Sequence, residues 1–372
     1  MKKMLMSVIG IGLGHATRSE AIYNKLKDEL KIKILSYGDA RNYFQRKGIP
    51  SEDFGGQMYK GEEFTFNMLF QINDFLKNPK KIKEDYKNFE KIADDFQPEL
   101  ILSDSEPNAV FYASNKKIKS ALLTNVITTV MNYHILPKKF KTGELKIQNF
   151  FLKKLVDIMV KRNKIVFVPS FERRIKYKEK VEYVDLIVRK KPSEIDSEKE
   201  LREKLGIKRK FYYVSVGGSD LERYLLNIFE EILPKFKDKF FIISSNYAKN
   251  SIIEKENMII YPFIHDPFQY LKICEGVIST AGHSAISESI VYKKPMLVIP
   301  VRKHVEQMVN AALLEKNGFG NACFFEKRIN NQYLIESLEK FFKEKNEIEA
   351  NLKNLKFKGE GSIEIAKKLN KF

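Results

Sequence analysis

The feature that most constrains this chain is a pair of glycine-bearing turns, one in each half. Residues 8–15 read VIGIGLGH and residues 214–219 read VSVGGS. Each turn follows an apolar run and precedes a segment with a capping-box pattern, Thr17…Glu20 in the first and Ser219…Glu222 in the second. A strand, a tight turn and a free helix N-terminus form an anion site, because unpaired N–H groups and the helix dipole favour phosphate. Two such units predict two similar α/β halves that face a shared cleft.

The length and composition of the chain agree with two domains. Its 372 residues exceed one core of ordinary size, and 43% of them are hydrophobic, which is ample for burial. The formal net charge of +18 suits an anionic partner, such as a nucleotide, a nucleic acid or an acidic membrane face. A solvated Lys- and Glu-rich surface explains the same charge equally well, so charge alone does not identify the partner.

The cysteines and the N-terminus indicate where the protein works. Cys274 and Cys323 show no metal-ligand spacing, so we expect a reduced, cytoplasmic protein without disulfides or zinc. The opening MKKMLMSV resembles a signal peptide in its charge, but its short apolar stretch ends at three glycines, which favours a buried first strand. No apolar run approaches the roughly 20 residues of a spanning helix. We therefore expect a soluble or peripheral protein.

Short apolar runs alternate with longer periodic segments along the chain. The short runs are rich in Ile, Val, Leu and Phe, which is typical of parallel strands covered on both faces. The alternation predicts two doubly wound, Rossmann-like α/β domains, residues 1–188 and 189–372, with a charged linker from residue 189. The expected strands are Met4–Ile9, Ile32–Ser36, Leu100–Ser103, Ala121–Thr124, Ile165–Val168, Phe211–Val216, Phe240–Ser244, Met258–Tyr261, Val277–Ser279 and Met296–Ile299.

Helix signals complete this pattern. Apolar residues from Leu221 to Ile232 share one face of a predicted helix, and a helix from about Val305 ends at the C-cap signal Asn317-Gly318. The last segment, 363–372, is helical and basic. We expect this last helix to return to the N-terminal domain.

The first glycine turn does not fit a dinucleotide site. The fingerprint needs glycine at its first, third and sixth positions, but the residues there are Gly10, Gly12 and His15. No acidic residue closes the second expected strand, and the chain contains no Walker motif. These absences argue against nicotinamide, flavin and P-loop chemistry.

His15 is the first candidate for chemistry. It lies where the first strand meets the predicted cleft, and an imidazole there suits proton abstraction from a hydroxyl. Asp104 ends a neighbouring strand on the same sheet edge, where its carboxylate would orient the imidazole. The alternative is structural: His15 caps the turn or contacts phosphate, and Asp104 caps a helix.

The most specific stretch runs from Ser279 to Glu288 and continues to Ala311. Gly282 allows close backbone approach, and Ser284 can start a helix whose N-terminus faces a pyrophosphate. Glu288 is expected in or near the first helical turn, where its carboxylate can accept from two ribose hydroxyls. Glu306 and Gln307 open the next helix on the same edge, with groups that suit sugar hydroxyls.

This combination resembles the nucleotide-sugar glycosyltransferases of the GT-B fold, in particular the lipid II N-acetylglucosaminyltransferase and UDP-glycosyltransferase families. The residues that carry the resemblance are Gly282, Glu288, Pro295, Gln307, Asn310 and Ala311 in the donor signature, and Gly12, Leu13, Gly14 and His15 in the acceptor loop. Two positions depart from the family pattern: Thr280 stands where a histidine is frequent, and Ala285 where a hydroxyl is frequent.

The resemblance implies a role for each residue. Glu288 would hold the ribose, and Glu306 with Gln307 would contact the sugar. His15 would be the base, with Asp104 as its partner. Ser219 and Ser284 would touch the diphosphate, and Phe263 and Ile264 would face the base. The remaining donor-binding residues are Gly217, Gly218, Gly282 and His283.

The reaction implied is an inverting sugar transfer from a nucleotide sugar, UDP-linked by the resemblance, to an acceptor hydroxyl. No Asp-x-Asp motif occurs, so we expect neither a metal nor another cofactor. The acceptor is small or lipid-linked. Residues 138–164 mix lysines with Phe and Leu, which suits an anionic membrane surface, although a core helix with a lysine-rich outer face explains the pattern too. The segment Phe54–Leu76 is either an acceptor loop or core.

Two other functional classes stay open at this point. An epimerase or hydrolase of nucleotide sugars would share the fold, but it would favour paired acids where Ser287 precedes Glu288. A non-catalytic nucleotide-sugar sensor would bind the donor without turnover. RNA binding is not expected, because no RNA-module signature is present and turns that face one cleft do not serve long polymers.

Overall fold

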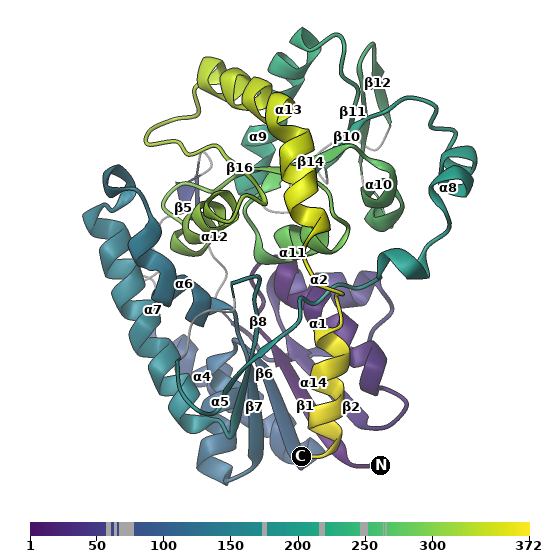
Figure 1. The fold of residues 1–372 in the computed structure, drawn as a ribbon. Coiled ribbons are helices and arrows are strands. Elements are labelled where there is room, and N and C mark those ends of the chain that lie inside the picture. Colours follow the sequence, from purple (N-terminus) through teal and green to yellow (C-terminus); the bar gives the residue numbers. More distant parts are fainter. Residues whose placement is uncertain are drawn as a thin grey trace.

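In the computed structural model the chain forms two α/β halves, drawn one above the other in Figure 1. The structure describes residues 1–56, 61–62, 65–66, 78–172, 177–215, 220–245, 252–262, 264 and 266–372. Gly217, Gly218, Ser219 and Phe263 lie outside the described residues, as does most of the segment Phe54–Leu76, which was expected to be either an acceptor loop or core.

The N-terminal half is built on a parallel sheet with the strand order β3-β2-β1-β6-β7-β8-β9. Side chains alternate between its two faces: Met4 and Met6 join one apolar cluster, and Leu5 joins another. Both faces are therefore core. The strands are β1 Lys3–Val8, β2 Lys31–Ser36, β3 Ser51–Asp53, β6 Leu100–Asp104, β7 Lys119–Leu123, β8 Ile165–Pro169 and β9 Val181–Val184, and a separate ribbon pairs β4 Gly61–Glu62 with β5 Thr65–Phe66.

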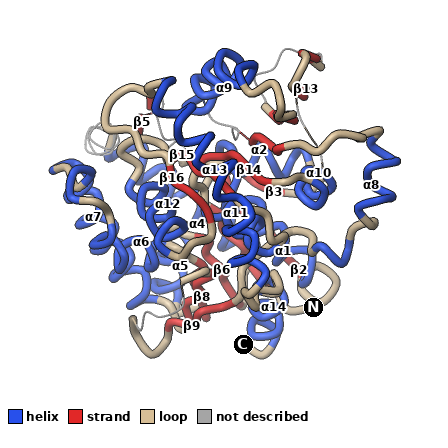
Figure 2. Tube along the Cα trace, turned by 45° about the horizontal axis from the view of Figure 1, so that its top comes forward, coloured by secondary structure: helices blue, strands red, loops and turns tan. Residues whose placement is uncertain are grey.

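Helices cover both faces of this sheet, and Figure 2 shows them in blue around the red strands. They are α1 Leu13–Leu26, α2 Gly38–Arg46, α4 Pro79–Phe96, α5 Pro107–Lys116, α6 Val126–Asn132 and α7 Gly143–Arg162, with short 3₁₀ turns at Tyr133–Ile135 and Lys138–Phe140.

The C-terminal half repeats the plan with the strand order β12-β13-β11-β10-β14-β15-β16. Its strands are β10 Tyr212–Ser215, β11 Phe241–Ser244, β12 Ile253–Lys255, β13 Met258–Tyr261, β14 Gly276–Thr280, β15 Met296–Ile299 and β16 Gly320–Ala322. Its helices are α8 Glu198–Leu205, α9 Asp220–Ile232, α10 Pro267–Ile273, α11 His283–Val291, α12 Val305–Lys316 and α13 Asn331–Lys353, with 3₁₀ turns at Pro192–Glu194 and Leu233–Lys235.

The last helix, α14 (Gly361–Asn370), lies against the N-terminal half. Ile365 and Leu369 are fully buried in the apolar cluster that contains Met4 and Met6. Figure 1 shows α14 beside α1, with the two chain ends next to each other. The chain thus crosses between the halves a second time after α13.

The expected fold class is confirmed, and the ten expected strands are present to within about two residues at each end. Four edge strands were not expected: β3, β9, β12 and β16. Of these, β12 pairs antiparallel with β13. Edge strands bury less apolar surface, so their sequences carry a weaker signal.

The expected capping box at Thr17…Glu20 is wrong. Helix α1 already begins at Leu13, and the hydroxyl of Thr17 donates to the carbonyl of Gly14 (3.0 Å) inside the helix. Gly12 has φ of 67°, a left-handed conformation that suits glycine and turns the chain within one residue. The helix therefore starts directly after the turn.

Candidate functional site

Each sheet has one point where the strand order reverses, and the candidate site lies between these two points. In the N-terminal half the reversal falls between β1 and β6, and in the C-terminal half between β10 and β14. Loops at the carboxyl ends of such strands diverge and leave room for a ligand. His15 follows β1, Asp104 ends β6, and Gly282 to Ser284 follow β14.

His15 and Asp104 meet at the reversal point of the N-terminal sheet. Parallel pairing places Val8 of β1 opposite Asp104 of β6, which carries the carboxylate to the base of α1. There Asp104 Oδ1 lies 2.8 Å from His15 Nδ1. The carboxylate is fully buried, whereas the imidazole is 20% exposed, so one ring nitrogen is held by the protein and the ring still reaches solvent.

Other donors hold Asp104 as well. Arg18 donates from Nε to Oδ2 (2.8 Å) and from Nη2 to Oδ1, and the hydroxyl of Ser19 donates to Oδ2 (2.8 Å). Burial would raise the pKa of Asp104, but the charges and hydrogen bonds of Arg18 and His15 outweigh it and hold that pKa well below its usual range. Asp104 is therefore a carboxylate at neutral pH, and it accepts from His15.

One backbone donor of the first glycine turn already has a partner within the chain. The N–H of Gly12 donates to Asp39 Oδ2 (3.0 Å), in the first turn of α2. A carboxylate of the chain itself thus occupies the favourable position at the N-terminus of α1, where the sequence pattern predicted phosphate.

The donor-side helix α11 touches this turn directly. Its first residue is His283 and its N-cap is Gly282, one residue earlier than the expected start at Ser284. The hydroxyl of Ser284 donates to the carbonyl of Gly14 across the two halves (3.2 Å). The acceptor-side turn and the N-terminus of α11 are therefore neighbours.

Glu288 lies just past the first turn of α11, close to its expected position in or near that turn. It is the sixth residue of α11, and so belongs to the second turn of the helix. Its Oε1 accepts from Arg189 Nη2 (3.4 Å), and Arg189 Nη1 also donates to the hydroxyl of Tyr43 on α2 (3.2 Å). Burial raises the pKa of Glu288 although Arg189 acts against it. The side chain of Glu288 is 17% exposed, and Arg189 connects it to Tyr43 of the N-terminal half.

The start of α12 lies next to the imidazole–carboxylate pair. Oε1 of Glu306 accepts from Asn125 Nδ2 of the N-terminal half (2.7 Å), and Asn125 Oδ1 accepts from Arg18 Nη1 (2.9 Å). Burial would raise the pKa of Glu306, but His304, His15 and Asn125 lower it below its usual range. Gln307 Oε1 accepts from the N–H of Val301 (3.0 Å), which fixes the amide.

His283 differs from His15 in its surroundings. It is buried, its ring stacks on Phe171 at 5.9 Å, and burial lowers its pKa to about 4. The imidazole of His283 is therefore uncharged at neutral pH. Ile264 is also buried, within the apolar cluster of the C-terminal half.

Four residues around the site were not singled out from the sequence: Arg18, Asp39, Asn125 and Arg189. Arg18 lies within an amphipathic segment and Arg189 within a charged run, where both resemble surface residues. Asp39 and Asn125 follow β2 and β7 at the carboxyl edge of the sheet. That position was the one available signal for them.

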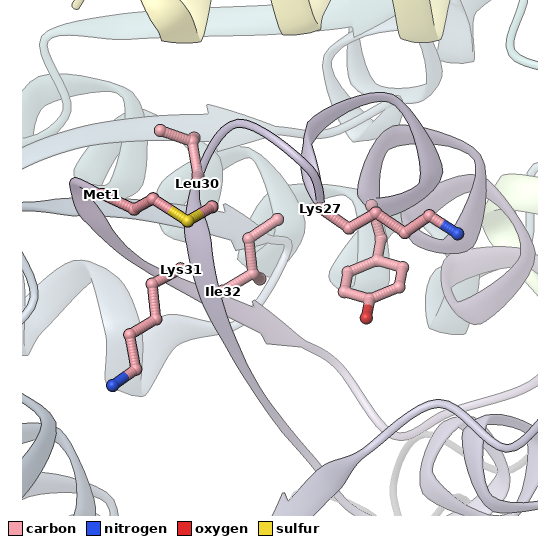
Figure 3. Close-up of a pocket in the computed structure, with 6 residues that line it drawn as sticks. Met1, Lys27, Leu30, Lys31 and Ile32 are labelled. Atoms are coloured by element: carbon pink, nitrogen blue, oxygen red, sulfur yellow. The ribbon is translucent and has the colours of Figure 1, made fainter.

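A pocket in Figure 3 lies away from this site. Met1, Tyr23, Lys27, Leu30, Lys31 and Ile32 line it, near the amino ends of β1 and β2. It thus opens at the opposite edge of the N-terminal sheet from His15. Within the described residues no group of three or more His, Cys, Asp or Glu side chains forms a metal site. No helix among those residues is long and apolar enough to cross a membrane.

Comparison with solved structures defines the fold. The chain superposes on a UDP-glucosyltransferase from Polygonum tinctorium with a TM-score of 0.71, over 100% of this chain and 99% of that one, at 12% identity. It superposes on MurG of Acinetobacter baumannii with a TM-score of 0.61, over 100% of each chain, at 14% identity. The two facing sheets are thus the GT-B fold of glycosyltransferases.

The model of glycosyl transferase family 1 matches residues 2–342, and the chain belongs to this family. It is a glycosyltransferase. An uncharacterized glycosyltransferase of Methanosarcina mazei is 24% identical over 86% of this chain and 84% of its own. A UDP-N-acetylglucosamine--N-acetylmuramyl-(pentapeptide) pyrophosphoryl-undecaprenol N-acetylglucosamine transferase of Caldicellulosiruptor saccharolyticus is 34% identical over 40% of this chain and 44% of its own.

Proposed function

We propose that the enzyme transfers a sugar with inversion from a UDP-sugar to an acceptor hydroxyl, and that His15 is the general base. The observation that carries this proposal is the His15–Asp104 pair, which lies beside the start of α11 and of α12. The alternatives of a hydrolase, an epimerase or a sensor lose support, because the family and its relatives are glycosyltransferases.

His15 is arranged for proton abstraction. Asp104 is ionised and can only accept, so the Nδ1 of a neutral His15 donates to it and Nε2 keeps its lone pair. An acceptor hydroxyl at Nε2 gives up its proton as its oxygen attacks the anomeric carbon. The bond to the diphosphate breaks on the opposite face of the sugar, which inverts the configuration.

The leaving diphosphate gains negative charge during this step. The N-terminus of α11 lies next to the glycine turn, and its first N–H groups after Gly282 supply donors for that charge. This dipole replaces a metal in our proposal. Activity should therefore persist in the presence of EDTA, and its loss would contradict a mechanism without a metal.

Donor recognition falls to the carboxylates of α11 and α12. Glu288 would accept from the ribose hydroxyls. Glu306 would use Oε2 for the sugar, because Oε1 already accepts from Asn125. Gln307 would donate from its NH₂ group, because its carbonyl oxygen is taken by Val301.

The decisive experiment is a release assay for nucleoside diphosphate with UDP-, GDP- and dTDP-sugars, with and without acceptors. Donor binding is measured first, as thermal stabilisation; saturation at 100 times Kd adds about 2.7 kcal/mol to the unfolding free energy. Proton NMR of the product then gives the anomeric configuration. Retention of configuration, or donor binding without acceptor-dependent release, would contradict the proposal.

We also propose that the exposed face of α7 rests on an anionic membrane and so brings a lipid-linked acceptor to the site. One face of α7 is core, with Val156 and Met159 buried. The opposite face exposes apolar side chains beside lysines: Ile147, Phe150, Phe151, Leu155 and Ile158, with Lys146, Lys153, Lys154 and Lys161. Figure 2 places α7 at the margin of the molecule. Apolar insertion and lysine charge together favour an anionic lipid surface.

Flotation with vesicles of anionic and of neutral lipid tests this surface. Wild-type protein should bind the anionic vesicles and be released by salt, and Phe150→Glu should abolish binding. Tyr333→Glu, at an exposed aromatic residue on α13, is the matched control and should bind as wild type. Equal flotation of the Phe150 variant would remove the membrane surface from the account.

A further inference from the structure

The side chain of Arg18 makes more contacts in the site than its place in the sequence suggests. Its guanidinium contacts Asp104 through Nε and Nη2, and Asn125 through Nη1. Nη2 also lies 2.9 Å from His15 Nδ1. Only 5% of the side chain is exposed. Removing this charge from water costs free energy, which the hydrogen bonds of its N–H groups offset.

The contacts on Asp104 form a complete set. Oδ1 receives His15 Nδ1 and Arg18 Nη2, and Oδ2 receives Arg18 Nε and the hydroxyl of Ser19. Two donors on each oxygen fill the usual acceptor capacity of a carboxylate. The two-pronged contact from Arg18 fixes the plane of the carboxylate, because a guanidinium fork matches its geometry.

The third nitrogen of the guanidinium, Nη1, is connected through Asn125 to the C-terminal half. Asn125 receives Arg18 Nη1 on its oxygen and donates from its NH₂ group to Glu306 of α12. Arg18 and Asn125 therefore connect the imidazole–carboxylate pair of one half to a carboxylate at the start of α12 in the other.

We infer that Arg18 is a positioning residue: it locks Asp104 so that His15 presents Nε2 to the acceptor, and through Asn125 it sets Glu306 against the same centre. The inference rests on the proposed function for His15 and Glu306. Arg18 itself touches no reacting atom. Its effect reaches the reaction through the orientation and tautomer of His15 and through the position of Glu306.

Arg18→Lys tests the first part of this inference, that Arg18 fixes Asp104 and His15. Lysine keeps the buried positive charge beside Asp104, so the variant should fold. Its single ammonium group cannot replace the three guanidinium nitrogens that contact Asp104 and Asn125. We expect kcat to fall about 10–100-fold and the donor KM to rise by no more than about tenfold, because Asn125 keeps its contact with Glu306 but loses its donor Arg18. Arg46→Lys makes the same change at an exposed position of α2 and should leave kcat unchanged.

A second readout does not depend on transfer. In protein labelled with ¹⁵N at histidine, NMR of the free enzyme reports which nitrogen of neutral His15 carries the proton, and His15→Gln identifies the signal. Wild type should show hydrogen on Nδ1, and Arg18→Lys a mixture of both tautomers. If folded Arg18→Lys keeps both the wild-type kcat and the Nδ1–H tautomer, the inference is wrong.

Asn125→Ala tests the second part of the inference, that Asn125 positions Glu306. This variant leaves the Arg18–Asp104 contacts in place. The His15 tautomer should stay on Nδ1, while the donor KM rises about tenfold because Glu306 loses its partner. An unchanged donor KM would overturn this link. A wild-type enzyme without transfer to any acceptor would refute the proposed function instead, and the tautomer measurement would still decide the role of Arg18.

Discussion

At the residue scale, two buried acids two positions apart have pKa values shifted in opposite directions. Asp104 and Glu106 are both almost fully buried. Arg18 and His15 hold the pKa of Asp104 below its usual range. Burial raises the pKa of Glu106 to about 7, and the groups that act on it, Asn108, Tyr37 and Asp85, include no cation. A cationic neighbour thus decides which acid is a carboxylate near neutral pH.

This difference predicts a pH dependence of stability that belongs to Glu106. Because its pKa is higher in the folded protein, its contribution is fully present below the unfolded pKa and is lost as the pH rises through about 7. Glu106→Gln should therefore gain stability relative to wild type between pH 5 and pH 8, by up to about 3 kcal/mol. Urea unfolding at both pH values measures the gain. The same difference between variant and wild type at both values would refute it.

At the element scale, α11 places its residues on two different neighbours. Its first turn contacts the glycine turn through Ser284 and Gly14, and its second turn contacts Arg189 through Glu288, while Arg189 in turn donates to Tyr43. One helix thus presents donors at its N-terminus and a carboxylate one turn later. That spacing suits a diphosphate followed by a ribose.

The assignment of Glu288 to the ribose predicts a specific loss of discrimination. Wild type should prefer a ribose donor over its 2′-deoxy analogue. Glu288→Gln should weaken binding of the ribose donor by about 10–100-fold and leave the 2′-deoxy donor nearly unchanged. Calorimetric titration with both donors measures this. A variant that loses affinity for both donors equally would show that Glu288 acts on something other than the ribose.

The same elements show what the sequence could reveal. Strands buried on both faces, such as β1 and β14, are continuous apolar runs and were predicted, whereas short edge strands such as β16 were not. The start of α1 was misplaced, because a glycine at positive φ begins the helix without the capping pattern. The start of α11 was expected one residue late, at Ser284 instead of His283, because the exact ends of helices are weakly encoded in sequence.

The polar contacts of the site were harder to predict than its fold. His15 and Asp104 were identified because they follow strands at one sheet edge. Arg18 was missed, because its place in the site depends on contacts with Asp104 and Asn125, which are distant in sequence. Arg189 was read as part of a charged linker, and only the folded chain brings it to Glu288.

At the scale of the whole molecule, the chain ends by tying its two halves together. Helix α14 follows the C-terminal half and yet buries Ile365 and Leu369 against the first sheet. The start of α14 is held there as well, because the N–H groups of Lys358 and Glu360 donate to Asp185 Oδ2 (2.9 and 3.1 Å). The chain therefore connects the two halves twice, at the linker from residue 189 and at the segment between α13 and α14.

Leu369 gives a direct test of this crossing. Leu369→Ala removes a fully buried side chain and should lower the unfolding free energy by about 2–5 kcal/mol. Lys367→Ala, at an exposed position of the same helix, should change it by less than about 0.5 kcal/mol. Urea unfolding of both variants provides the comparison. Equal stabilities would mean that α14 is not docked.

The central claim is that a base in one half serves a donor held by the other, and His15→Gln tests it most directly. The account predicts that kcat falls by about 10²–10⁴-fold while the Kd of the UDP-sugar, measured by calorimetry on the same sample, stays at the wild-type value. A variant that binds the donor and transfers the sugar at the wild-type rate would contradict the account.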